Sequence, residues 1–92
     1  MAEAQLLFKT RSSHAGGVVE MVVWKVPKPV PPSGHSFKYR LVFVRNNHRV
    51  VGYDNERGKG DHKHVGGREM PYKFMDIETL MADFLRDVKA MQ

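Results

Sequence analysis

Apolar side chains gather in short stretches along the chain, and each stretch predicts a β-strand. The first two are residues 5–9 and 18–26, and the second is rich in valine and contains the only tryptophan. β-Branched and aromatic residues favour strands, and apolar side chains on both faces of 18–26 predict a central position in a sheet. Residues 11–17, which include Gly16 and Gly17, have the composition of a turn.

Residues 37–44 and 49–53 predict a β-hairpin. In the first of these segments, aromatic and aliphatic residues alternate with cations, as expected for a strand with two different faces. The asparagine pair at 46–47 fits a two-residue turn, because asparagine tolerates positive φ. This turn would place Arg40 opposite Tyr53, so that both side chains lie on one face of the sheet.

The remaining segments predict a connection, an edge strand and a helix. Four prolines in residues 27–34 predict a stiff, extended connection. Residues 69–74 predict a short strand, which Pro71 confines to the edge of the sheet. Asp76 is a favoured N-cap residue, and apolar residues recur at helical spacing over 77–91, so a helix is predicted there.

Together these elements predict an α+β fold, a small antiparallel β-sheet of about four to five strands with a C-terminal α-helix packed across one face. The 92 residues form one domain, 1–92, and the absence of cysteine means that apolar packing holds it together. No apolar run approaches the roughly 20 residues of a membrane-spanning helix. The N-terminus lacks the pattern of a signal peptide. We therefore expect a cytoplasmic protein without membrane contact.

The charge distribution points to a polyanionic ligand. The chain has 15 Lys and Arg against 10 Asp and Glu, a net charge of +5. Residues 35–68 contain eight of these cations and three of these acidic residues, and so account for the whole excess. Such clustering favours a nucleic-acid-binding surface over a generally basic one. The residues expected to contact nucleic acid are Lys38, Arg40, Tyr53 (by stacking on a base), Arg57, Lys59 and Lys63.

A polar segment, residues 53–64, directly follows the predicted hairpin. Binding and catalytic groups are commonly found on such loops when a rigid scaffold holds them. His62 and His64 are one residue apart and so point to the same side of an extended chain. Histidine titrates near neutral pH, so this pair can supply the acid and the base for RNA cleavage without a metal. Lys59 would stabilise the negative charge of the phosphate, and Asp61 or Asp54 would orient a histidine or a cation.

Other interpretations of the same segment remain open. Asp61, His62 and His64 are also suitable ligands for a divalent metal such as zinc. No other cofactor is expected, because the Gly-Lys-Gly run lacks the spacing of a phosphate-binding P-loop. The residues alone leave open whether the chain is an enzyme, for example an endoribonuclease, or a non-catalytic protein that binds nucleic acid.

Residues 53–64 resemble the Y-D-N-x-x-G-K-G-D-H-x-H signature of the TumE-type toxins of prokaryotic type II toxin–antitoxin systems. The resemblance extends to residues 23–27, 38–41, 71–74 and 83–88, and so covers nearly the whole chain. It implies a toxin that slows growth and an antitoxin partner, often one with a helix-turn-helix domain. RNA as the target follows only by analogy with other small basic toxins. The basic face would alternatively dock an acidic antitoxin, and the edges of so small a sheet leave a homodimer open.

Overall fold

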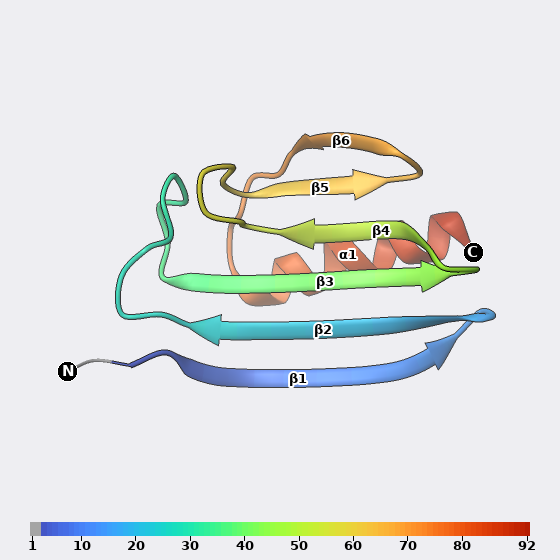
Figure 1. Ribbon diagram of the computed structural model, residues 1–92, viewed down its shortest axis with the longest axis horizontal. Coiled ribbons are helices and arrows are strands. Elements are labelled where there is room, and N and C mark those ends of the chain that lie inside the picture. The colour runs from blue at the N-terminus through green and yellow to red at the C-terminus, as the bar shows by residue number, and fades with distance from the viewer. Residues whose placement is uncertain (1–2) are drawn as a thin grey trace.

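The structure is a computed structural model and describes residues 3–92. It contains one antiparallel sheet of six strands arranged in chain order, with a single helix behind it (Figure 1). The elements are β1 (Gln5–His14), β2 (Gly17–Lys25), β3 (Phe37–Arg45), β4 (His48–Asp54), β5 (His62–Val65), β6 (Arg68–Pro71) and α1 (Ile77–Met91). The predicted α+β fold is confirmed. The strand count is higher than predicted because β5 forms where the sequence predicted a polar loop.

Helix α1 covers one face of the sheet, behind β3 and β4 in Figure 1. Its N-terminus is capped by Asp76, whose Oδ1 accepts a hydrogen bond from the backbone N–H of Thr79 at 2.6 Å, as predicted. The buried residues of the helix are Leu80, Phe84 and Val88. They pack on a core formed by Val19, Val23, Tyr39, Leu41, Phe43, Val51 and Tyr53. No helix in the described part of the chain has the length and apolarity needed to cross a membrane.

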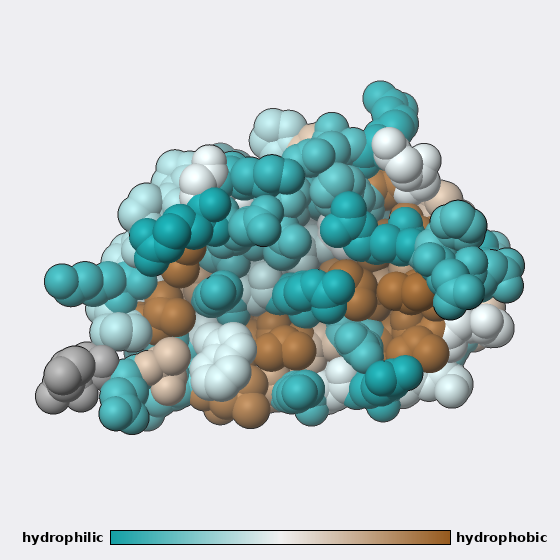
Figure 2. Space-filling view, viewed as in Figure 1, coloured by the Kyte–Doolittle hydropathy of each residue, from teal (hydrophilic) through white to brown (hydrophobic). Residues whose placement is uncertain are grey.

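The opposite face, which we call the open face, carries no helix and looks towards the viewer in Figures 1 and 2. Figure 2 shows hydrophilic side chains lying across apolar patches on this face. The open face has two edges, β1 and β6. Strand β1 is longer than predicted because the turn before β2 takes only Ala15 and Gly16, both at positive φ. Pro71 lies in the edge strand β6, as predicted.

The β3–β4 hairpin has the predicted turn but not the predicted pairing. Asn46 and Asn47 have φ of 54° and 63°, as expected for a two-residue turn. Beyond the turn, Val50 is an extra residue in β4, because Val44 pairs with Arg49 and the next pair is Phe43 with Val51. A bulge of this kind moves every later residue to the other face of the sheet.

The predicted pairing of Arg40 with Tyr53 is therefore wrong. Arg40 pairs with Asp54 on the open face, whereas Tyr53 pairs with Leu41 and is completely buried under the helix. This arrangement is favoured because it puts Val50, Val51 and Tyr53 together against the apolar side of α1.

The proline-rich connection between β2 and β3 is folded back on the sheet rather than extended, contrary to the prediction. It turns at residues 31–32 and buries Val30 and Ser33. The carbonyl of Pro31 accepts a hydrogen bond from the N–H of Gly58 at 2.9 Å. The connection is thereby joined to the loop between β4 and β5, which leads to His62.

Asn55 fixes the start of that loop to the first residues of β3. Its side chain is buried, with 1 % of the residue exposed. Its Oδ1 accepts the N–H of Tyr39 at 3.0 Å, and its Nδ2 donates to the carbonyl of Phe37 at 2.6 Å. The side-chain amide of Asn55 thus makes two hydrogen bonds to the backbone of β3, beyond the point where β4 ends.

We expect Asn55→Ala to lower the free energy of unfolding by about 1–3 kcal/mol, because the mutation leaves a buried N–H and a buried carbonyl without partners. Urea denaturation followed by circular dichroism measures the change. Lys73→Ala, which removes an exposed side chain, is the control and should change stability by less than about 0.5 kcal/mol. Equal stability of the two variants would contradict this role for Asn55.

Candidate functional site

The two predicted histidines lie on the open face, in neighbouring rows of paired residues. Across one row, consecutive strands contribute Arg40, Asp54 and His62. Across the next row they contribute Gly52, His64 and Glu69. The rings of His62 and His64 are 5.6 Å apart between centroids and are inclined at 75° to one another. The structure therefore brings the predicted pair together, on a strand rather than on a loop.

His62 is nearly buried, with 8 % of its side chain exposed. Its Nδ1 lies 2.9 Å from the carbonyl oxygen of Gly60, and because a carbonyl only accepts, Nδ1 is the donor. Its Nε2 lies 2.6 Å from Asp54 Oδ1. That contact does not line up with the ring N–H, and Asp54 Oδ1 has no hydrogen bond among the described residues. Of the two ring nitrogens, Nδ1 is thus held by the Gly60 carbonyl, and Nε2 faces Asp54.

His64 is more accessible, with 19 % of its side chain exposed. Its Nε2 is 3.6 Å from Glu69 Oε2, which is beyond hydrogen-bonding distance. The other oxygen of Glu69 lies 3.8 Å from Nζ of Lys59, whose side chain is 55 % exposed. Lys59, His62 and Glu69 together border a shallow hollow of about 210 Å³. The predicted catalytic lysine is thus beside the histidines and is held only weakly.

Arg49 is a cation of this site that the sequence analysis did not single out. A Cβ on Gly52 would meet Cδ of Arg49 at 2.7 Å, so the arginine side chain lies flat over that glycine. Gly52 pairs with His64, and Arg49 is therefore next to the histidine pair. A glycine inside a predicted strand is the sequence signal that could have indicated such a close approach.

The carboxylate placed to bind a metal with the two histidines is that of Glu69, not that of the predicted Asp61. The ligand atoms of His62, His64 and Glu69 all lie within 4.8 Å of one another. Asp61 is outside this group among the described residues, and its carboxylate is bound to other side chains. A metal would also have to compete with Asp54 for Nε2 of His62, since Nδ1 is held by the Gly60 carbonyl.

Asp61 instead anchors the proline-rich connection. Its carboxylate accepts hydrogen bonds from Ser33 Oγ at 2.6 Å, His35 Nε2 at 2.7 Å and the Tyr39 hydroxyl at 2.6 Å. Burial alone would raise the pKa of Asp61, but these three bonds outweigh it and hold the pKa below its ordinary value. The histidine that Asp61 contacts is His35, which is not a member of the predicted catalytic pair. The ring of His35 stacks on Phe74 at 3.8 Å between centroids.

Two of the residues predicted to bind nucleic acid lie on the helix-covered face. The hydroxyl of Tyr53 donates a hydrogen bond to Asp87 of α1, and Nζ of Lys63 lies 3.1 Å from the same carboxylate. Burial and then this hydrogen bond raise the pKa of Tyr53. With its ring completely buried, Tyr53 has no face on which a base can stack. The cause is the bulge at Val50, which the sequence pattern did not reveal.

Of the other predicted contacts, Lys59 has been described above, and Lys38, Arg40 and Arg57 are accessible from the open face. Arg40 lies in the same row as His62, and its side chain is 59 % exposed. Lys38 and Arg57 lie at the end of the face near Trp24, where they line a larger pocket.

Comparison with known proteins identifies a family but no close relative. The sequence model described as "Toxin TumE" matches residues 3–92, almost the whole chain. No curated protein and no solved structure matches the chain.

The low pKa of Asp61 predicts a pH-dependent contribution to stability. The carboxylate stabilises the folded state fully above about pH 4, the ordinary pKa of an unfolded aspartate, and this contribution disappears as the pH falls through the lower pKa of the folded state. Asp61→Asn should therefore destabilise the protein most above about pH 4, and the difference from the parent should shrink towards about pH 2. Urea denaturation across this pH range measures it.

Glu56→Gln is the control, because it removes a carboxylate of the same loop whose side chain is 63 % exposed. Its effect on the free energy of unfolding should be small at every pH. The assignment of Asp61 as an anchor would be wrong if the two variants showed the same pH profile.

Proposed function

The chain belongs to the TumE toxin family, and from this premise we propose that it arrests growth by cleaving RNA without a metal. Membership of a toxin family implies an antitoxin partner. The family name does not specify a target or a reaction, so the proposal depends on the chemistry of the open face. The observation that carries it is the pair of imidazoles, His62 and His64, 5.6 Å apart on the sheet face that also presents the cations.

The two histidines differ in a way that suits the two proton transfers of RNA cleavage. Nε2 of His64 has no hydrogen bond among the described residues, so it is placed to act as the base. It removes the proton of a 2′-hydroxyl, whose oxygen then attacks the adjacent phosphorus. Nε2 of His62 faces a carboxylate and gives its proton to the leaving 5′-oxygen as the phosphorus–oxygen bond breaks. The products are a 2′,3′-cyclic phosphate and a free 5′-hydroxyl, so no water or metal is consumed in this step.

Asp54 has a defined place in this mechanism. Its Oδ1 lies against the proton-exchanging nitrogen of His62, off the direction of the ring N–H. Asp54 would thus orient the ring of His62 for the proton transfer.

Cations around the pair would stabilise the charge that develops on the phosphate. Arg49 lies over Gly52 next to His64, and Lys59 is close to Glu69. The contact between Lys59 and Glu69 is 3.8 Å long and exposed, so little free energy opposes the movement of the lysine to a phosphate. Arg40 extends the same surface in the row of His62 and would hold the neighbouring phosphate.

We expect His62→Ala and His64→Ala each to lower the rate of RNA cleavage by about 100-fold or more, because each removes one proton-transfer group. The assay is incubation of purified protein with a defined RNA, followed by mapping of the product ends. The parent should yield cyclic phosphates, and a chelator should leave its rate unchanged. His48→Ala, which changes an exposed histidine beside the β3–β4 turn, should cleave like the parent.

Circular dichroism must show that each variant is folded, since His62 is nearly buried. Full cleavage by both folded variants would exclude the histidine pair as the catalytic groups. Loss of the parent's activity on addition of chelator would instead favour a metal held by His62, His64 and Glu69.

Arg40→Ala should weaken RNA binding and lower the slope of log affinity against log salt by about 0.7, the change for one phosphate contact to a single strand. Arg86→Ala is a matched control, because Arg86 is 67 % exposed, against 59 % for Arg40, but lies on α1, behind the sheet. It should leave both affinity and slope unchanged. Measurement on an uncleavable 2′-O-methyl RNA separates binding from chemistry. An equal effect of both mutations would exclude the open face as the binding surface.

A further inference from the structure

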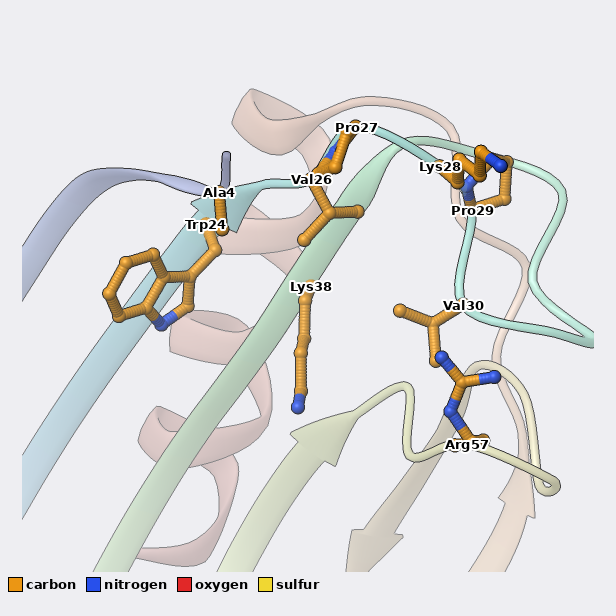
Figure 3. A pocket seen from close by; sticks show the side chains of 9 residues that line it. All are labelled: Ala4, Trp24, Val26, Pro27, Lys28, Pro29, Val30, Lys38 and Arg57. Atoms are coloured by element: carbon orange, nitrogen blue, oxygen red, sulfur yellow. The ribbon is translucent and has the colours of Figure 1, made fainter. Parts of the chain in front are cut away.

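A pocket on the open face lies away from the histidine pair, beside Trp24. It has a volume of about 730 Å³ and is bordered by Trp24, Val30, Lys38 and Arg57, with Pro27 and Lys28 at its rim. Figure 3 shows Lys38 between Trp24 on one side and Val30 and Arg57 on the other. The pocket combines an aromatic ring, aliphatic walls and cations, and no acidic residue lines it.

Trp24 is the only tryptophan of the chain and is unusually accessible for a residue of its size. It is 36 % exposed and pairs with Lys38 across the β2–β3 ladder. A second hollow of about 230 Å³, bordered by Trp24, Lys38 and Arg40, lies on the same face. A large aromatic residue between two open hollows is available for stacking, whereas burial in the core would have left it no free surface.

The cations of the pocket are free to bind an anion. Lys38 and Arg57 form no ion pair within the described residues 3–92. Unpaired cations beside an aromatic ring and apolar walls match the two parts of a nucleotide, a flat base and a phosphate. An acidic peptide would also match the charges, but it would make no specific use of the exposed indole.

We propose that this pocket binds an unpaired base of single-stranded RNA, which stacks on Trp24 while Lys38 and Arg57 hold the phosphates on either side. The inference builds on the proposed function, because it takes RNA as the ligand of the open face. It adds a requirement for an unpaired base, and it therefore makes single-stranded RNA the substrate class.

The base in the pocket belongs to a different nucleotide from the one that is cleaved. Trp24 is in β2 and His62 is in β5, three strands away. With strands about 4.8 Å apart, that is roughly 14 Å across the sheet. Arg40 lies between the two positions, in the row of His62 and two residues along β3 from Lys38. One strand of RNA would thus pass over Lys38 and Arg40 on its way to the histidines.

The single tryptophan makes a direct test possible, because all indole fluorescence comes from Trp24 and so from the border of this pocket. The probe is a 2′-O-methyl hexa-adenylate, which has no free 2′-hydroxyl and so is not cleaved. We expect it to quench the emission in a saturable way. An abasic hexamer of the same charge should bind about 5- to 100-fold more weakly, the loss expected for removing base–aromatic stacking.

Variants tested by anisotropy of a labelled hexa-adenylate complete the design. Trp24→Leu should weaken binding about 5- to 100-fold, whereas Trp24→Phe keeps an aromatic face and should retain most of the affinity. Lys38→Ala should lower the salt slope, and the helix variant Arg86→Ala should not. Lys38→Ala also serves as the second variant if Trp24→Leu fails to fold.

The inference is wrong if the abasic and base-bearing hexamers bind equally, or if Trp24→Leu binds like Trp24→Phe. It is also wrong if only an acidic, leucine-containing peptide changes the emission, since the pocket would then bind a protein segment. Base-dependent binding by a protein that cleaves no RNA would support this pocket and refute the catalytic proposal. RNA cleavage without base-dependent binding would support the catalytic proposal and refute the role of this pocket.

Discussion

The one-residue bulge at Val50 decides what each face of this protein can do. Strand residues alternate between faces, so an extra residue in β4 exchanges the faces of every residue after it. Tyr53 consequently packs under α1, while Asp54 joins Arg40 and His62 on the open face. Without the bulge, the tyrosine would be exposed and the carboxylate would face the core, where an unpaired charge is costly. Apolar packing against the helix and assembly of the site thus depend on the same local irregularity.

The bulge places His62 correctly only because the loop before β5 is held on its other side. Asp61, the residue immediately before this strand, accepts three hydrogen bonds from the segment that leads into β3 and from β3 itself. Gly58 bonds to the folded-back proline segment, and Gly60 supplies the carbonyl that fixes the ring of His62. Both glycines have positive φ, which lets the chain turn tightly there. The signature residues of this segment therefore divide into some that hold the backbone and some that lie on the open face.

Sequence patterns predicted the elements that depend on local rules and missed those that depend on distant contacts. The asparagine turn, the Asp76 cap and the apolar stripe of α1 follow from backbone preference and periodicity, and all three are present. His62 and His64 lie side by side as predicted, because their spacing fixes a common direction on any extended chain. The bulge has no such local signal, because the pattern of residues 49–53 suits either register. The role of Asp61 was also hidden, since its partners lie 22 to 28 residues away in the sequence.

The division between the two faces also separates stability from function. The helix-covered face contains most of the buried apolar residues, so substitutions there act mainly through folding. The cations of the open face are exposed, and their contacts with carboxylates, such as the 4.0 Å contact of Arg40 with Glu20, contribute little free energy. Cations held this loosely are of little use to the fold, but they can bind phosphate without first breaking a strong ion pair. On the proposed function, loss of activity in a folded variant of the open face therefore reports on ligand contacts rather than on the scaffold.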